Sequence, residues 1–280
     1  MTPRENSPIF LWCHPRSVSS AFERAFLTCS DEFICLHEPL SQAFYYGPEH
    51  ISPRYVSEPP PILGHATTRS VHSLIFDRQR ATDLRRVFVK DMAQFAISKP
   101  FQGRSVLSDP ADATAALVFP LSSFAKAQHT FLIRDPRKSI PSLYALSIDK
   151  DRSGWDSFLP SEAGYAEQVL LFRIVTEVLH LPTVVVDADD LCARPLAALK
   201  AYCDAIGVSF TREMCSWQEG PVDTFGTWKG WHDDAERSTG FVKRECADQP
   251  RMEGLPESVA KCIDSNIPHF EYLHERRLRF

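Results

Sequence analysis

Residues 9–20, IFLWCHPRSVSS, join a run of five apolar residues to a polar turn that carries one arginine and three serines. The run 9–13 predicts a strand buried on both faces, and the helical periodicity over 18–28 predicts a helix after the turn. A strand that leads through a turn into a helix presents free backbone N–H groups and the positive end of the helix dipole. These groups bind phosphate or sulfate, so the turn is a candidate anion site with Arg16 as its fixed positive charge.

Short β-branched runs recur along the chain and alternate with helical stretches. Further strands are predicted over 33–36, 87–89, 130–133 and 183–186. Helices are predicted over 161–180, 195–206 and within 255–280. This alternation predicts an α/β fold, a three-layer sandwich with a central parallel sheet, in which ligands bind at the carboxyl ends of the strands.

The composition is that of an ordinary globular chain. Its 280 residues carry 31 Lys and Arg against 36 Asp and Glu, a formal net charge of −5, and 44% of them are hydrophobic. This mild acidity disfavours a dedicated nucleic-acid binder, which usually has a basic face. No apolar run approaches the roughly 18–20 residues of a membrane span, and residues 1–8 lack the apolar segment of a signal peptide. We therefore expect a cytoplasmic protein with no nucleic-acid or membrane partner, and the sequence gives no indication of its oligomeric state.

The eight cysteines include no Cys-x-x-Cys pair. In a chain that stays in a reducing compartment, such residues are usually buried free thiols. We therefore expect neither disulfides nor a metal site.

A second anion site is predicted at the end of the strand 130–133. There Arg134 precedes Asp135-Pro136, and Pro is favoured at the first position of a helix. Ser142 lies eight residues beyond Arg134, which is roughly two turns inside that helix. Two anion sites at separate strand ends favour a ligand with two phosphate-like groups. The GxxxxGK[ST] loop typical of ATP-hydrolysing enzymes is absent from this turn, which disfavours ATP as the ligand.

These motifs, in this order, resemble the sulfotransferase family from about residue 8 to residue 242. Residues 15–20, PRSVSS, are similar to the family's 5′-phosphosulfate-binding loop, and Arg134 with Ser142 is similar to its 3′-phosphate-binding motif. Residues 184–195, VVVDADDLCARP, resemble a later strand and turn of the family. The resemblance implies the P-loop NTPase-like sulfotransferase fold in a single domain over residues 1–280. It also implies 3′-phosphoadenosine 5′-phosphosulfate (PAPS) as donor, adenosine 3′,5′-bisphosphate as product, and no metal.

Position by position, the resemblance implies that Arg16 contacts the bridging oxygen and the 5′-phosphate of PAPS. The other implied donor-binding residues are Ser17, Val18, Ser19 and Ser20 around the 5′-phosphate, and Arg134 and Ser142 at the 3′-phosphate. A segment near 225–242 is expected to close over the 3′-phosphate through Lys229 and Gly230. Two residues depart from the family pattern, because Val18 replaces a common glycine and Ala21 replaces a tryptophan that packs on adenine in many members.

Sulfuryl transfer needs positive charge at the leaving oxygen and, for a hydroxyl acceptor, a general base. Arg16 is the candidate for the leaving oxygen, and Lys90, at the end of the strand 87–89, is the candidate second cation. Glu38 is the leading base, because His37-Glu38-Pro39 resembles the Glu-Pro segment of carbohydrate and tyrosylprotein sulfotransferases. His37 and Asp91 stay alternatives for that base.

Met92 stands where cytosolic relatives carry their catalytic histidine, so a histidine-based mechanism is not expected. The resemblance therefore implies a sulfotransferase that moves a sulfuryl group by in-line displacement from PAPS to a hydroxyl or amine of a small-molecule acceptor. The alternative is a non-catalytic or repurposed nucleotide-binding protein of the same fold, suggested by Val18, Ala21 and Met92. Residues 52–63, SPRYVSEPPPIL, are dense in proline and follow the aromatic residues 44–46. The segment near 44–64 is therefore either a lid or specificity loop or a surface excursion.

Overall fold

A computed structural model describes residues 7–49, 51–55, 66–81, 85–241 and 254–280. It contains a five-stranded sheet with the strand order β2-β3-β1-β4-β5. The strands are β1 (Ile9–Cys13), β2 (Phe33–His37), β3 (Arg86–Met92), β4 (Gln128–Ile133) and β5 (Thr183–Asp187). All five predicted strands are present, and four of them extend beyond the apolar runs that predicted them.

The strand β1 lies between β3 and β4 and is parallel to both. Leu11 lies opposite Lys90 and Trp12 lies opposite Phe131 in these ladders. The strand β2 is in turn parallel to β3. All five residues of β1 are buried, as expected for a strand covered on both faces. The predicted α/β fold with a central parallel sheet is confirmed.

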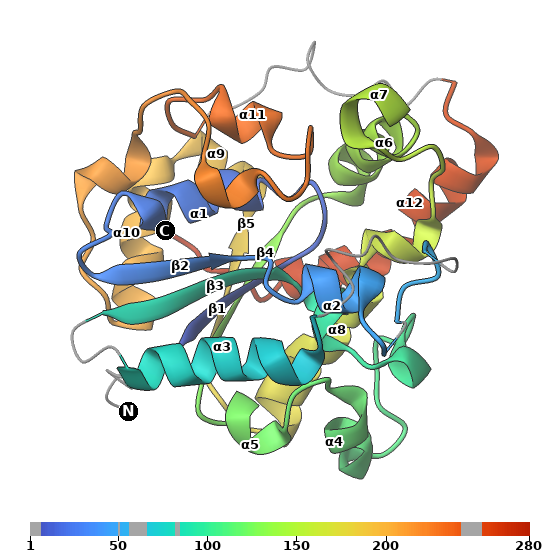
Figure 1. Cartoon of the computed structure of the whole chain (residues 1–280), viewed down its shortest axis with the longest axis horizontal. Coiled ribbons are helices and arrows are strands. Elements are labelled where there is room, and N and C mark those ends of the chain that lie inside the picture. Colours follow the sequence, from blue (N-terminus) through green and yellow to red (C-terminus); the bar gives the residue numbers. More distant parts are fainter. Residues whose placement is uncertain (1–6, 50, 56–65, 82–84, 242–253) are drawn as a thin grey trace. The chain divides into compact units, whose positions relative to one another are not determined.

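The chain forms two compact units, which are described separately. The first comprises Met1–Cys13, Ser30–Phe131 and Gly164–Thr183. Its helices are α2 (Ser41–Tyr46), α3 (Thr68–Ala81), α4 (Ala113–Ala116), α5 (Leu121–Phe124) and α8 (Tyr165–Arg173). The helix α3 packs against β3 and runs along the sheet (Figure 1). The expected single domain over 1–280 stays a prediction.

An aromatic stack forms the centre of the first unit. The rings of Phe10 and Trp12 lie 4.7 Å apart and nearly parallel, and the ring of Phe124 stacks against both. Trp12 Nε1 donates to His129 Nδ1 over 2.9 Å, and the other ring nitrogen of His129 lies 2.9 Å from the carbonyl of Phe124. His129 is therefore a core histidine whose nitrogens are both satisfied, as buried polar groups require.

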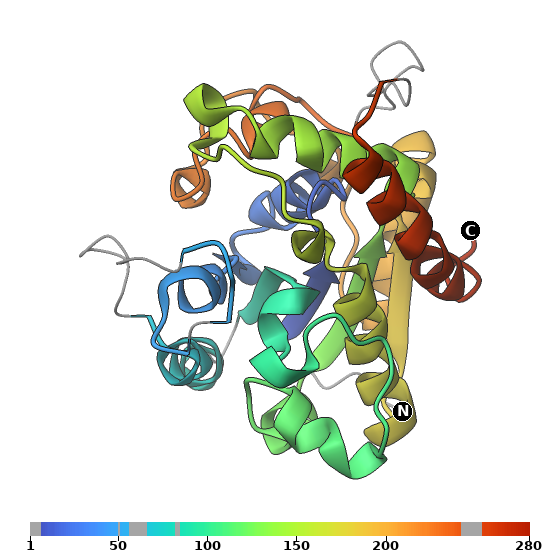
Figure 2. The same cartoon turned by 90° about the vertical axis from the view of Figure 1, so that its right-hand side faces the viewer.

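The second unit comprises His14–Cys29, Leu132–Ala163 and Val184–Phe280. Its helices are α1 (Ser19–Leu27), α6 (Pro136–Ser147), α7 (Lys150–Ser153), α9 (Ala188–Ala193), α10 (Pro195–Ile206), α11 (Asp233–Glu236) and α12 (Glu257–His274). The helices α6 and α12 pack against each other (Figure 2). In α1, Phe22 and Phe26 meet the edge of Tyr202 from α10. The predicted helix 195–206 is confirmed at both ends, and Gly207 ends it with a φ of 70°.

The predicted helix 161–180 is wrong in its extent. Gly164 has a φ of 72°, a left-handed conformation that a right-handed helix cannot include, and α8 begins only after it. A side chain at this position would also approach Gln94 Oε1 to 2.9 Å. After α8 the chain makes a π-helical turn over Ile174–Val178. The periodicity was therefore correct, but it ran through a glycine that the backbone uses as a break.

Three further expectations concern the chain as a whole. The seven cysteines within the described ranges are free thiols. None of the described helices combines the length and the apolar character needed to cross a bilayer. Phe44 to Tyr46 end the helix α2, whereas residues 56–65 lie outside the described residues, so the expected lid near 44–64 stays a prediction.

Candidate functional site

The turn between β1 and α1 holds two non-glycine residues in the left-handed region of backbone conformation. Arg16 has a φ of 62° and Val18 a φ of 69°. Val18 directly precedes α1, no described side chain caps this helix start, and its first turn contains no acidic residue. The N–H groups and positive dipole end of α1 are therefore left for a ligand, and such a helix start binds oxyanions.

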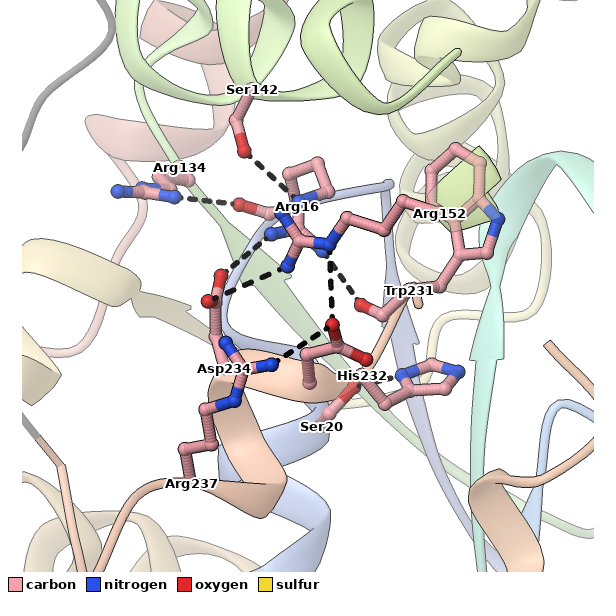
Figure 3. A network of polar contacts seen from close by, with 10 residues as sticks. Arg16, Ser20, Arg134, Ser142, Arg152, Trp231, His232, Asp234 and Arg237 are labelled. Carbon is pink, nitrogen blue, oxygen red and sulfur yellow. Dashed lines mark hydrogen bonds and ion pairs between the residues drawn. The ribbon is translucent and has the colours of Figure 1, made fainter. Parts of the chain in front are cut away.

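Arg16 lies at the centre of a polar network (Figure 3). Its Nε donates to Ser142 Oγ over 3.0 Å, and its Nη1 donates to the carbonyl of Trp231 over 2.7 Å. Its Nη2 forms an ion pair with Asp234 over 2.9 Å. The side chain is only 14% exposed, and two segments of the second unit hold this guanidinium: the helix α6 through Ser142 and the segment 231–234.

Arg134 joins the same network from the end of β4. Its Nη1 donates to the backbone carbonyl of Arg16 over 2.8 Å (Figure 3). The residue after it, Asp135, caps α6 by accepting from the backbone N–H of Arg137 over 2.8 Å. The start of α6 is therefore neutralised by the chain itself, and the side chains of Arg134 and Ser142 are the candidate ligand groups at this strand end.

The serines of the turn differ in what they contact. Ser17 is fully buried, and its Oγ has no hydrogen-bond partner among the described residues. Leaving a buried hydroxyl unpaired costs about 1–3 kcal/mol, which an oxygen of a bound ligand would offset. Ser20 Oγ lies 2.8 Å from His232 Nδ1, and Ser19 is buried in the first turn of α1. An unpaired hydroxyl, an uncapped helix start and a fixed guanidinium together fit an anionic ligand at this turn.

The expected closing segment contacts the turn through residues that the sequence did not single out. Trp231, His232 and Asp234 make those contacts, whereas Lys229 is exposed. Gly230 has a φ of 79°, and a side chain there would collide with the carbonyl oxygen of Arg152. Only glycine therefore lets the segment pass so close to α7.

Two acidic residues tie this segment to arginines. Asp233 pairs with Arg152 Nε over 3.2 Å and with Arg237 Nη2 over 3.6 Å. Arg152 Nη2 also lies 3.9 Å from Asp234. The network thus contains four guanidinium groups, counting those of Arg16 and Arg134, and two carboxylates. This surplus of positive charge favours an anion.

A second cluster lies in the first unit, at the ends of β2 and β3. Glu38 forms an ion pair with the fully buried Lys90, and its backbone N–H donates to the carbonyl of Lys90 over 2.8 Å. Glu38 has a φ of 42°, an uncommon conformation for a glutamate. His37 Nε2 lies 3.8 Å from Glu38 Oε1. The two predicted catalytic residues Glu38 and Lys90 therefore contact each other directly.

Asp91, the alternative base, is fully buried beside this pair. Its two carboxylate oxygens accept the backbone N–H groups of Leu40 and Met92, each over 2.9 Å. Burial, together with the nearby charge of Glu38, raises the pKa of Asp91 well above its usual value, against the opposing effect of these hydrogen bonds. This carboxyl joins the end of β3 to the turn after Glu38, which is a structural role.

Met92 occupies the position at which a histidine would be expected in cytosolic relatives. It is buried, and its Sδ lies 3.5 Å from Cys13 Sγ. A thioether is a weak acceptor and does not transfer protons. A histidine-based mechanism at this position is therefore excluded by the residue itself.

Comparisons with known proteins place the chain in a family. A model of the sulfotransferase domain matches residues 110–270. Branched-chain-amino-acid aminotransferase-like protein 1 of Arabidopsis thaliana is 30% identical over 155 residues, which are 55% of this chain and 25% of that protein. Sulfotransferase ppzF of Metarhizium majus is 26% identical over 181 residues, which cover 54% of this chain and 52% of that protein. The chain thus spans about a quarter to a half of the length of these relatives.

The solved structure of a sulfotransferase from Alicyclobacillus acidocaldarius aligns over 97% of both chains, with a TM-score of 0.50 and 12% sequence identity. At this identity the likeness concerns the fold. The family match covers more than half of the 280 residues. The chain therefore belongs to the sulfotransferase domain family, and its α/β fold is the P-loop-like fold of sulfotransferases.

Proposed function

We propose that the protein transfers a sulfuryl group from PAPS to a hydroxyl or amine group of a small-molecule acceptor. The observation that carries this proposal is the contact between the two predicted anion sites. Arg16 bonds Ser142, and Arg134 bonds the backbone of Arg16, so both sites belong to one network. PAPS carries anionic groups at its 5′ and 3′ positions, and a joined pair of cationic sites suits such a ligand.

The donor-binding roles follow from the groups that each residue offers. Arg16, the buried hydroxyl of Ser17, the backbone of Val18 and the start of α1 with Ser19 and Ser20 would hold the 5′-phosphosulfate. Arg134 and Ser142 would hold the 3′-phosphate, and Lys229 and Gly230 belong to the segment that would cover it. PAPS, when bound, supplies the activated sulfuryl group. The positive charge of Arg16 would stabilise the negative charge that develops on the leaving oxygen.

The acid–base role goes to the cluster in the first unit. In the proposed reaction the acceptor oxygen forms a bond to sulfur while the bond from sulfur to the bridging oxygen breaks. The bonding electrons go to the 5′-phosphate, and the acceptor proton goes to Glu38. The ion pair with Lys90 favours the carboxylate form that a base requires. In this unit the ring of Tyr45 lies 5.0 Å from that of Phe44 and 5.9 Å from that of Tyr55, and such an aromatic cluster suits a partly apolar acceptor.

Met92 favours a second candidate function, a nucleotide-binding protein of this fold that does not catalyse transfer. Binding and turnover separate the two. Calorimetry should show tighter binding of adenosine 3′,5′-bisphosphate than of ATP or adenosine 5′-monophosphate. Incubation with PAPS and a library of alcohols, phenols and amines should then yield products one SO₃ group heavier by mass spectrometry. Bisphosphate binding without any such product would support the non-catalytic function.

Arg134→Ala provides the matched variant for the donor assignment. The change removes one guanidinium from the network and should weaken bisphosphate binding about tenfold or more, as expected for a lost charged hydrogen bond. It should change the binding of adenosine 5′-monophosphate much less, and circular dichroism should show a folded chain. Unchanged bisphosphate affinity would remove Arg134 from the donor site.

A further inference from the structure

The side chain of His14 lies between the turn that carries Arg16 and the strand end that carries Arg134. His14 is 1% exposed. Its Nδ1 lies 3.0 Å from the carbonyl oxygen of Pro15, and its Nε2 accepts the backbone N–H of Arg134 over 3.0 Å. The imidazole therefore spans the gap between the two predicted anion sites of the second unit.

These two contacts define the form of the ring. A carbonyl oxygen only accepts and a backbone N–H only donates, so the ring hydrogen must lie on Nδ1 and the free electron pair on Nε2. Burial lowers the pKa of His14 to about 3, and the positive charge of Arg134 acts in the same direction. The imidazole is therefore neutral near pH 7, which keeps Nε2 available as an acceptor.

The side chain of Arg134 makes a second contact to the same turn. Its backbone is held by His14, and its Nη1 donates to the carbonyl of Arg16 over 2.8 Å. Arg16 lies only two residues after His14, so the contacts close a ring: the His14 side chain, the Arg134 backbone, the Arg134 side chain and the Arg16 backbone. Arg134 is therefore tied to the turn that carries Arg16 through both its backbone and its guanidinium.

We infer that His14 is a positioning residue that fixes the separation of the two anion sites and so selects a ligand with two anionic groups. This inference rests on the proposed donor class. A ligand with two linked anions gains from its second anion only when both sites are held at the matching separation. A ligand with a single anion gains nothing from that separation.

Two substitutions that differ by one methylene test this role. Glutamine can place a carbonyl oxygen where Nε2 lies and accept from Arg134. Asparagine reaches only to the place of Nδ1, where it can bond Pro15 but leaves the N–H of Arg134 without its acceptor. The measured quantity is the affinity ratio of adenosine 3′,5′-bisphosphate to adenosine 5′-monophosphate, by calorimetry. We expect His14→Gln to keep the wild-type ratio within about twofold and His14→Asn to lower it about tenfold.

Each outcome has one meaning. An unchanged ratio in His14→Asn, or an equal loss of both affinities, would overturn the positioning role, since a structural defect alone weakens both ligands. A wild-type protein that does not prefer the bisphosphate would instead contradict the proposed donor and leave the geometry of His14 untouched. The failure of the inference and the failure of the proposed function are therefore distinguishable.

A measurement on the wild-type protein covers the case in which His14→Asn does not fold. Nuclear magnetic resonance of ¹⁵N-histidine-labelled protein distinguishes the two neutral tautomers and the imidazolium. We expect the His14 ring to carry hydrogen on Nδ1 alone at pH 7, with and without the bisphosphate. An Nε2–H ring or an imidazolium would overturn the inference, because neither could accept from Arg134.

Discussion

Val18 shows how one residue can depart from a family pattern without losing the local backbone. Its φ of 69° is a conformation that glycine adopts freely and a β-branched residue adopts only under strain. The strain destabilises the folded protein by about 1–3 kcal/mol. Glycine would remove this strain but would lower the stability by about 0.5–1 kcal/mol, because it makes the unfolded chain more flexible. We therefore expect Val18→Gly to raise the free energy of unfolding by about 1 kcal/mol in urea titrations. Val18→Ala, which keeps a Cβ at positive φ, is the control and should give no such gain; equal effects would refute the strain argument.

Glu38 carries the second prediction at the residue scale. Glu38→Gln removes the carboxylate that would accept the proton but keeps a similar shape beside Lys90. Turnover should fall about 100-fold or more, the usual range for a lost general base, while the affinity for adenosine 3′,5′-bisphosphate stays near that of the wild type. Steady-state kinetics and calorimetry measure the two effects separately. Full turnover in this variant, with a loss in His37→Gln, would move the base to His37.

At the scale of elements, the segment around α11 affects donor binding, because the carboxylate of Asp234 pairs with the guanidinium of Arg16. Asp234 pairs with Arg16 Nη2 over 2.9 Å, so an anionic donor would compete with it. Asp234→Asn should tighten bisphosphate binding severalfold, since an ion pair of this exposure contributes about 1 kcal/mol or less. Asp233→Asn is the matched control, because it removes the same charge one residue away. Asp233 pairs with Arg152 and Arg237. Weaker binding in Asp234→Asn would show that the carboxylate supports Arg16 instead of competing for it.

Elements also mark the limit of what the sequence could predict. Apolar runs identified all five strands of the described residues, because buried parallel strands are encoded locally by adjacent residues. The candidate site residues Arg16, Arg134 and Ser142 could be predicted because they follow those strands closely in the sequence. The structure brings these three residues into one network. The contact between Arg16 and Asp234 joins residues 218 positions apart. No local pattern encodes such a pair, and the acidic residues 233 and 234 look like an ordinary exposed helix start.

For the whole molecule, net charge and local charge have opposite signs. The chain carries a formal charge of −5, yet the network of the second unit sets four guanidinium groups against two carboxylates. Composition alone therefore argued only against a nucleic-acid partner and could not reveal an anion site. The arginines of that site come from separate stretches of sequence and are brought together only when the chain folds.

The pH dependence of stability links the positioning role of His14 to the whole molecule. Burial lowers the pKa of His14 to about 3, below the value near 6.5 of the unfolded chain. Below pH 6.5 His14 therefore binds a proton in the unfolded chain but not in the folded protein, so the free energy of unfolding falls as the pH falls. His14 alone should reduce the free energy of unfolding by about 2 kcal/mol between pH 7 and pH 5. Glutamine does not titrate, so His14→Gln should lack this part of the dependence of the free energy of unfolding on pH.

Urea titrations of both proteins at half-unit steps from pH 7.5 to pH 5 measure this difference. The carboxylates and the other histidines with lowered pKa, His72 and His269, are present in both proteins, so their effects cancel. The comparison concerns the slope and does not depend on the absolute stability of the variant. Parallel curves for the two proteins would mean that His14 takes up its proton in the folded state. A protonated ring could not accept from Arg134, and the tie between the two anion sites would then be absent in solution.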